Sequence, residues 1–329
     1  MFEIVFFGTS ASAPSIQRGL TSQAILAGEQ RFLIDCGEGT QRQILRSGIG
    51  FKRLNQILLT HSHLDHILGL GGLVSTFARW ENIEKLQIYG SRQTLDRVHN
   101  LLYGVVLGYE KLPVDIQLLE VKPGLFLEFK DFTVSAFSVS HRGTASLGYV
   151  FEERSRRPFL VDVAESLGVP NGPERGQLVA GKTVTLKDGR TITPDMVLGD
   201  SIRGQKLVYV GDTGRTDNIK SHVQDADVLV IESTFLHSHQ ENAAVFGHLT
   251  AKDAAELALE AGVKTLILNH ISRRYRESAM RDEAQRIFPN TIIARDLDHF
   301  VMKRDQPLEK LTAEVSRKRN LEPEADVGE

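Results

Sequence analysis

The residues of this chain with the clearest capacity for chemistry form one short block, HSHLDH at residues 61–66. His61 and His63 are two residues apart after an apolar stretch, so in extended backbone both imidazoles point to the same side and can bind one metal ion. Asp65 and His66 then face a neighbouring position as the chain turns into a helix. Packing these imidazoles and the carboxylate into one turn without a cation would leave several polar groups unsatisfied. The block therefore predicts a metal site, whereas any one of its histidines alone would be read as a structural or surface residue.

Three further residues of metal-ligating type follow apolar stretches elsewhere in the chain: His141, Asp212 and His270. Each stands at the C-terminal end of a predicted strand, where sites form in layered α/β folds, although each alone could be a turn residue. We expect two sets of ligands joined by a bridging Asp212: His61, His63 and His141 for one ion, and Asp65, His66 and His270 for the other. Nitrogen and oxygen ligands without a thiolate favour two Zn²⁺ ions per subunit, with Mn²⁺ or Fe²⁺ as alternatives.

Such a site predicts hydrolysis. Two ions about 3.5–4 Å apart can share a hydroxide and polarise a phosphoryl or carbonyl oxygen, so the expected nucleophile is metal-bound water. Asp65 is placed to orient this water and accept its proton. The leaving group needs an acid, and His248, in a glycine-flanked loop before a predicted helix, is the predicted general acid, with Glu232 as its expected partner. The alternative for His248 is an exposed loop histidine without a catalytic role.

Basic residues lie beside two of the predicted ligands. Arg142 follows His141 directly, and the segment ISRRYR at 271–276 follows His270. A charge run is usually a solvated face, but arginine makes bidentate contacts with phosphate, so these positions favour a polyanionic substrate. The formal net charge of −3 indicates no particular partner, and a nucleic-acid enzyme of this composition must concentrate its positive charge locally.

The elements that must position these residues are short apolar strands alternating with helices. In the first half, strands are predicted at 3–8, 31–37, 56–61 and 86–90, and helices at 40–48, 66–79 and 92–106. The second half repeats this layout, with strands at 206–213, 227–234 and 264–270 and helices at 250–261 and 276–287. The strands between Val114 and His141 have no intervening helix, which predicts an antiparallel meander. Two such halves packed face to face give an α/β fold, a four-layer αββα sandwich with the site along one edge.

Composition and segment character set the domain organisation. The chain of 329 residues is 41% hydrophobic and 25% charged, as expected for a soluble globular protein. Cys36 is the only cysteine, so an intramolecular disulfide is excluded, and we expect a cytoplasmic protein. No segment resembles a secretory signal or a membrane span, so no membrane partner is expected. We predict a hydrolase domain at 1–302, with an extended arm inserted at 152–204, and a charged tail at 303–329.

Motifs spread over most of the chain resemble those of ribonuclease Z, the tRNA 3′-processing endonuclease family of the metallo-β-lactamase superfamily. They occur in the family's order: FFGTSASAP (6–14), LIDCGEGTQRQ (33–43), LLTHSHLDHILGL (58–70), VSHRG (139–143), YVGDT (209–213), GHLTA (247–251) and LNHISRRY (268–275). The resemblance implies a metallo-β-lactamase fold and the seven metal ligands named above. It also implies Asp65 as base and His248 as general acid.

The inserted segment carries the resemblance further. Residues 167–199 resemble the family's flexible arm, an exosite that clamps the elbow of a tRNA bound to the other subunit of a homodimer. The resemblance therefore implies a homodimeric, zinc-dependent endoribonuclease that removes the 3′ trailer from precursor tRNA and leaves a 3′-hydroxyl. The chain departs from the family in the loop at 14–22, which keeps Arg18 but lacks the usual lysine and asparagine, and at Leu249, where serine is usual.

Two other functions stay open at this stage. The first is a di-zinc hydrolase of small phosphodiesters or sulfate esters, which would use the same ligands while the arm served another purpose. The second is a non-catalytic RNA-binding or assembly protein that keeps the metal for stability. The complete ligand set together with His248 weighs against the second.

Overall fold

The computed structural model describes residues 1–79, 83–108, 114–312 and 315. The chain divides into two compact units, and the smaller one consists of residues 130–132 and 152–204. Most of the predicted charged tail at 303–329 lies outside the described residues, and its described start contributes the short strand β17 (Glu309–Lys310). Within the described parts of the chain, no helix is both long and apolar enough to cross a bilayer.

The first half of the chain builds most of an eight-stranded sheet with the order β17-β16-β1-β2-β3-β4-β5-β6. Strands β3 to β6 run parallel to one another, whereas β1 is antiparallel to its neighbours. The strands are β1 (Phe2–Gly8), β2 (Ser22–Ala27), β3 (Gln30–Ile34), β4 (Gln56–Leu58), β5 (Lys85–Gly90), β6 (Asp115–Glu120) and β16 (His299–Met302). The helices are α1 (Thr40–Ser47), α2 (Leu64–Ile67), α3 (Leu70–Phe77) and α4 (Arg92–Leu101), which continues as the π-helix η1 (Leu102–Val106).

The second sheet has seven strands in the order β15-β14-β13-β12-β9-β8-β7. Strands β12 to β15 are parallel, and every residue of β13 and β14 is buried, as expected for strands covered on both faces. The strands are β7 (Gly124–Glu128), β8 (Phe132–His141), β9 (Thr144–Glu153), β12 (Lys206–Val210), β13 (Val228–Glu232), β14 (Thr265–Asn269) and β15 (Thr291–Ile293). The helices are α8 (Lys220–Val223), η2 (His237–His239), α9 (Gln240–Phe246), α10 (Ala251–Glu260) and α11 (Glu277–Gln285).

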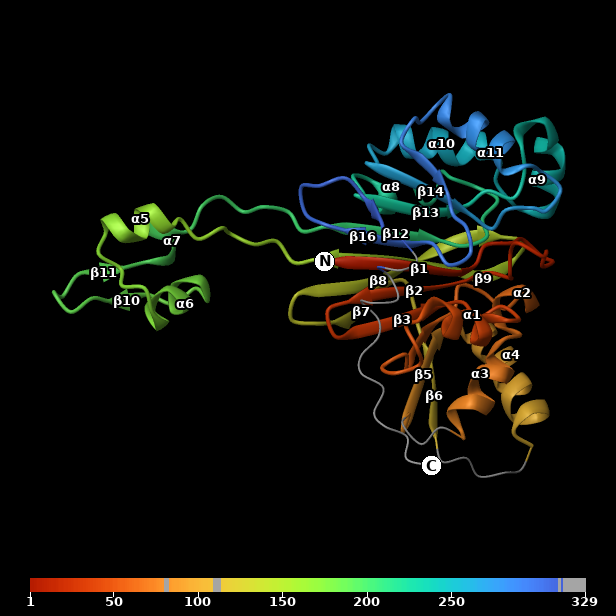
Figure 1. Ribbon diagram of the computed structural model, residues 1–329, viewed down its shortest axis with the longest axis horizontal. Coiled ribbons are helices and arrows are strands. Elements are labelled where there is room, and N and C mark those ends of the chain that lie inside the picture. Colours follow the sequence, from red (N-terminus) through yellow and green to blue (C-terminus); the bar gives the residue numbers. More distant parts are fainter. Residues whose placement is uncertain (80–82, 109–113, 313–314, 316–329) are drawn as a thin grey trace. The chain divides into compact units, whose positions relative to one another are not determined.

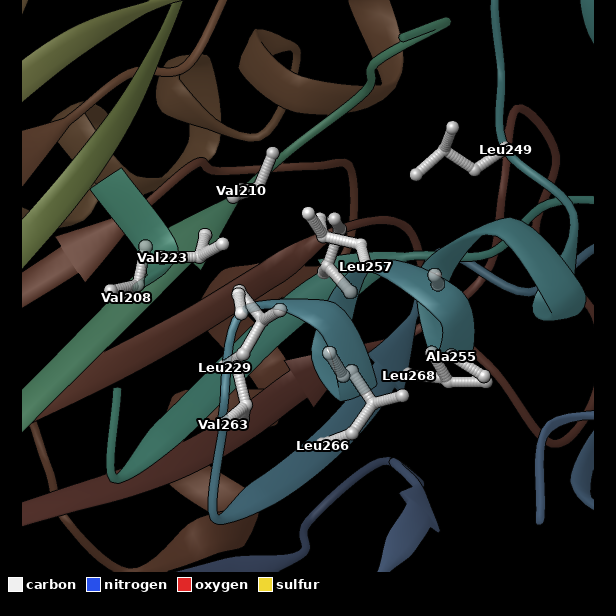
Figure 2. Packing of buried hydrophobic residues seen from close by; sticks show 14 of the residues in the cluster. Val208, Val210, Val223, Leu229, Leu249, Ala255, Leu257, Val263, Leu266 and Leu268 are labelled. Atoms are coloured by element: carbon white, nitrogen blue, oxygen red, sulfur yellow. The ribbon is translucent and has the colours of Figure 1, made fainter. Parts of the chain in front are cut away.

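The two sheets pack against each other, with helices on both outer faces, so the predicted αββα sandwich is confirmed (Figure 1). Aromatic rings join the sheets: Phe151 of β9 lies edge-on to Phe32 of β3 and to Phe2 of β1, at centroid distances of 5.3 and 6.2 Å. Figure 2 shows the outer core of the second sheet, where Ala255 and Leu257 of α10 lie over the apolar strand residues. These contacts fix the two sheets relative to each other, and with them the strand ends that carry the predicted metal ligands.

Helix α10 begins where its sequence predicts. The Thr250 side chain accepts a hydrogen bond from the Asp253 backbone N–H, and the Asp253 carboxylate accepts one from the Thr250 N–H, which completes a capping box. The cap fixes the loop that carries His248 just before the helix. Leu249, the departure from the family's serine, is 3% exposed and packs into the outer core, where Figure 2 labels it.

The predicted antiparallel meander between Val114 and His141 is wrong. Strand β6 joins the first sheet, parallel to β5, and only β7 and β8 form an antiparallel pair, in the second sheet. The reason is the helix before β6, because a helical crossover lets the returning strand pair in parallel. The chain then changes sheet between Glu120 and Gly124.

The predicted helix at 66–79 is divided at Gly69. A Cβ atom there would lie 2.0 Å from the Gly37 carbonyl oxygen, and the Gly69 N–H donates to the Cys36 carbonyl. This close approach separates α2 from α3 and holds α2 against the end of β3. The helix that carries Asp65 and His66 is therefore fixed by backbone contacts.

The smaller unit has its own small core. Its elements are α5 (Val161–Ser166), α6 (Pro173–Val179), β10 (Val184–Thr185), β11 (Thr191–Ile192) and α7 (Pro194–Val197). The buried apolar side chains of this core are Ala164, Val169, Leu178, Val184, Ile192 and Val197. Several of its arginines pair with acids of the same unit: Arg157 with Asp195, Arg175 with Glu165, and Arg190 with Asp188. Much of the positive charge of the arm is therefore neutralised locally.

Candidate metal centre

The structure brings all the predicted ligands together at one edge of the larger unit. The first sheet supplies the block at 61–66, in the loop after β4 and in α2, and the second sheet supplies the end of β8 and the turns after β12 and β14. The donor atoms fall into two close groups, each within 4.8 Å: His61, His63, His141 and Asp212, and Asp65, His66 and His270.

Asp212 lies between the two groups and faces each with a different oxygen. Its Oδ2 is 3.6 Å from His61 Nε2 and 3.7 Å from His141 Nε2. Its Oδ1 is 3.3 Å from the Nε2 atoms of both His66 and His270. A carboxylate that divides its oxygens in this way can bridge two cations.

The side chains fit a pair of divalent cations. His61 Nε2, His66 Nε2 and Asp212 Oδ1 are buried and have no hydrogen-bond partner among the described residues. Buried polar atoms without partners are costly, and a cation between them removes that cost. Imidazole nitrogens and carboxylate oxygens suit zinc, with other first-row metals as alternatives. The cluster is a metal-binding site.

Asp35 supports ligands of both groups, a role that the sequence analysis missed. One of its carboxylate oxygens lies 2.8 Å from His66 Nδ1 and accepts a hydrogen bond of the same length from the Thr60 hydroxyl. Its other oxygen accepts from the Thr60 N–H, and the Thr60 hydroxyl lies 3.0 Å from His61 Nδ1. Partners of this kind fix the tautomer and orientation of a ligating histidine. The sequence did contain a signal for Asp35, because it is an aspartate directly after an apolar strand, as Asp212 is.

Glu232 supports the opposite side of the site. Its Oε1 lies 2.8 Å from His248 Nδ1 and accepts from the Thr213 N–H at 3.0 Å. Its Oε2 accepts from the Thr234 hydroxyl, which lies 3.0 Å from His270 Nδ1. A single buried carboxylate therefore orients both the predicted general acid and a predicted ligand.

The charge states follow from these contacts. Burial raises the pKa of the Asp212 carboxyl, but His270 and His66 beside it hold that pKa well below its ordinary value. The pKa of His61 lies well below its ordinary value, mainly because His61 is buried. His61 is therefore neutral, and one ring nitrogen keeps a lone pair that can bind a metal ion. Burial alone would lower the pKa of His248, yet the Glu232 carboxylate raises it to about 9. His248 is therefore protonated at neutral pH, as an acid must be.

A cleft of about 540 Å³ opens beside His248. Among its lining residues are Arg142, Arg273 and Arg274, the basic residues that the sequence places after two ligands. Among the described residues, none of these arginines forms an ion pair. Arg18 of the loop at 14–22, in contrast, has a side chain that is only 13% exposed. It donates to the Thr9 hydroxyl, the Ala294 carbonyl and the Glu277 carboxylate, so it supports the loop.

Comparisons with known proteins first define the class. The family model described as "Beta-lactamase superfamily domain" matches residues 174–271, and that described as "Anti-Pycsar protein Apyc1" matches residues 2–159. The solved structure of the short form of human tRNase Z is similar to this chain with a TM-score of 0.64 and 22% identity, over 92% of this chain and 99% of that one. The metallo-β-lactamase fold protein YhfI from Bacillus subtilis gives 0.63 and 18%, over 91% of this chain and 98% of that one. The chain has the metallo-β-lactamase fold.

Curated relatives then define the family. "Ribonuclease Z" from Bradyrhizobium diazoefficiens is 47% identical over 302 residues, which cover 92% of this chain and 100% of that protein. "Ribonuclease Z" from Archaeoglobus fulgidus is 43% identical over 90% of this chain and 96% of that one. The chain belongs to the ribonuclease Z family, and the predicted family, fold and enzyme class are confirmed.

Proposed function

We propose that this protein is a zinc-dependent endoribonuclease that cleaves precursor tRNA at its 3′ trailer and leaves a 3′-hydroxyl on the tRNA. The observation that carries the proposal is the His248–Glu232 pair, held at 2.8 Å beside a two-group ligand set and opening into a cleft with three arginines. A metal site kept only for stability needs neither a positioned acid nor arginines without acidic partners. The relatives named ribonuclease Z support the choice of substrate.

In this proposal each of the two ligand groups would hold one Zn²⁺, and Asp212 would contribute to both groups. Two bound dications would polarise the scissile phosphoryl group and lower the pKa of a water molecule beside it. Asp65, whose Oδ2 accepts a hydrogen bond from the Ser12 N–H at 3.0 Å, receives a proton of the attacking water. The water oxygen bonds to phosphorus and the P–O3′ bond breaks. His248 has Nδ1 held by Glu232, so its Nε2 gives the proton to the leaving 3′ oxygen.

The arginines of the cleft serve the substrate in this scheme. Arg273 and Arg274 bind phosphates next to the scissile one, because guanidinium groups match phosphate oxygens in pairs. We further propose a cytoplasmic homodimer in which the arm at 152–204 contacts the tRNA away from the reacting phosphate. The separate core of the arm supports this role, since such a segment can fold as its own unit.

The test is cleavage of an unmodified precursor tRNA with a 3′ trailer by zinc-loaded wild type, Asp65→Ala and His248→Ala. Bis(p-nitrophenyl) phosphate, which needs little acid assistance for its leaving group, is the matched small substrate. We expect wild type to cut next to the last nucleotide of the tRNA, and both variants to lose this by at least about 100-fold. We expect His248→Ala to keep most of its activity on the small substrate. Zinc-dependent turnover of the small ester with an intact precursor tRNA would overturn the processing function and favour a hydrolase of small phosphodiesters.

A further inference from the structure

The cleft beside His248 has an aromatic side that the hydrolytic scheme does not use. Phe246, the last residue of α9, lines the cleft with 44% of its side chain exposed. The neighbouring ring of Phe235, 6% exposed, is almost parallel to it, with an interplanar angle of 6° and a centroid distance of 6.3 Å. The orientation of the exposed ring is therefore set by a buried one, and the exposed ring adds no large share to the core.

Arg142 adds a cationic plane to this side of the cleft. Its guanidinium carbon lies 5.9 Å from the centre of the Phe246 ring, and its side chain is exposed. Arg142 and Gly143 form the two-residue turn between β8 and β9, and both have the positive φ that such a hairpin turn favours, 42° and 70°. The hairpin turn therefore fixes the position of Arg142 beside the cleft.

Small residues also line the cleft and leave room for a flat group. They are Ala11, Ser12 and Ala13. The volume of about 540 Å³ falls within the roughly 300–1,000 Å³ of small-ligand sites. Aromatic and arginine side chains stack on any nucleobase, because every base has a π-face. A cleft lined by an aromatic ring, a guanidinium and small residues is suited to one base.

We infer that Phe246 and Arg142 form a stacking site for the base of the last nucleotide retained on the RNA product. This inference rests on the proposed cleavage chemistry, which assigns the nucleotide. His248 gives its proton to the O3′ atom of that nucleotide, and His248 and Phe246 line the same cleft. The ribose whose O3′ leaves must therefore lie at this cleft, and its base lies within reach of the ring.

The test combines a variant with removal of the base. The enzymes are wild type, Phe246→Leu, which keeps an apolar side chain, Phe246→Tyr, which keeps the ring, and the control Val245→Ala. Val245 is the preceding residue of α9, is 74% exposed and does not line the cleft. The substrates are an intact precursor tRNA, one abasic at the last retained nucleotide, and one abasic at the first trailer nucleotide.

We expect loss of the last retained base to lower kcat/KM of wild type by about 10-fold, in the range measured for base–aromatic stacking. Phe246→Leu should show the same loss on the intact substrate and no further loss on the abasic one. Phe246→Tyr and Val245→Ala should behave as wild type. If Phe246→Leu lowers kcat/KM on the abasic substrate as much as on the intact one, the two losses are independent and the inference is overturned. If the effect of Phe246→Leu instead disappears when the first trailer base is missing, the cleft binds the trailer base and the inferred nucleotide is wrong.

A binding measurement separates this inference from the proposed function. Product tRNA that ends in 2-aminopurine has no bond to cleave, and its fluorescence falls when the base stacks. We expect quenching by wild type and Phe246→Tyr, and at least a threefold smaller change with Phe246→Leu at saturating protein. Equal quenching by Phe246→Leu would overturn the stacking site. If wild type cleaves no precursor at all, the proposed function fails, and the fluorescence result still decides whether a terminal base stacks on Phe246.

Discussion

Replacing Asp35 by asparagine should weaken metal binding without disturbing the backbone. Asp35 has a φ of 55°, and asparagine is among the residues that tolerate this left-handed conformation best. The amide oxygen can still accept from the Thr60 N–H, as the carboxylate oxygen does at 2.8 Å. The amide NH₂ then faces His66 Nδ1, where the carboxylate oxygen stood at 2.8 Å. Two N–H groups cannot bond to each other, so the His66 proton must move to Nε2, the nitrogen that faces Asp212.

That proton occupies the lone pair that a metal ion needs. Loss of a partner that orients a ligating histidine typically lowers metal affinity about 10–100-fold, or roughly 1.4–2.7 kcal/mol. The effect should fall mainly on the ion held by the Asp65, His66 and His270 group, because Asp35 contacts His66 directly and His61 only through Thr60. A matched variant, Thr60→Val, removes the hydroxyl contact to His61 and should weaken mainly the other ion.

The assay is a competition titration of metal-free protein with zinc, analysed for two affinities, with circular dichroism to check the fold. Asp35→Asn should weaken one of the two affinities, and Thr60→Val should weaken the other. If Asp35→Asn binds both ions with wild-type affinity, the buried carboxylate does not set the His66 tautomer and the reasoning is refuted. If both variants lose both zinc affinities equally, the substitutions have instead disrupted the whole edge of the sheets that carries the metal centre.

Three other predictions test separate parts of the molecule. Glu232→Gln removes the charge that raises the pKa of His248 to about 9, so that pKa falls. Because the acid works only when protonated, the loss of kcat/KM at alkaline pH should shift to lower pH, and an unmoved profile between pH 6 and 10 would refute this role. Gly148→Ala places a Cβ 2.3 Å from the Phe137 ring and should lower the free energy of unfolding by about 1–3 kcal/mol, measured by urea titration. The control Gly104→Ala has open space around the new Cβ and should leave the free energy of unfolding unchanged. Replacing the arm by a short glycine-serine linker should reduce cleavage of precursor tRNA at least about 10-fold, because multivalent contacts raise affinity only for the large substrate. Turnover of bis(p-nitrophenyl) phosphate should stay within about twofold of wild type. Equal losses on both substrates would mean that the arm supports the fold of the site.

The clustering of the candidate metal ligands could be predicted from the sequence because its signals are local. The block at 61–66 combines metal-ligating types at the spacing of an extended strand end, and His141, Asp212 and His270 each follow an apolar stretch. The orienting residues could not be found in this way, since Asp35 and His66 are 31 positions apart and meet only because β3 and β4 are neighbours. Likewise, an alternating apolar pattern does not say which strand will be its partner, which is why β6 was assigned to a meander.

Phe246 shows a different limit. In the sequence it is one apolar residue at the end of a helix, indistinguishable from a residue that packs inward. Its exposure follows from the ring of Phe235 beneath it and from Gly247, which ends the helix with a φ of 65°. Those two features are tertiary, so an aromatic residue that faces a ligand and one that fills a core have the same local pattern. The stacking role that we infer for this position follows only when exposure, neighbours and the cleft are considered together.

The division of ligands between the two sheets has a consequence for stability. The first group takes His61 and His63 from the first sheet and His141 from the second, and the second group is divided in the same way. In the proposed two-ion site, neither ion could therefore be fully coordinated unless the sheets are packed in their native alignment at this edge. Metal binding then adds directly to the free energy that holds the sheets together, since the unfolded chain offers no such site. By the same linkage, a change at the Phe32–Phe151 contact between the sheets must alter metal affinity if it shifts the alignment, although neither ring touches a ligand.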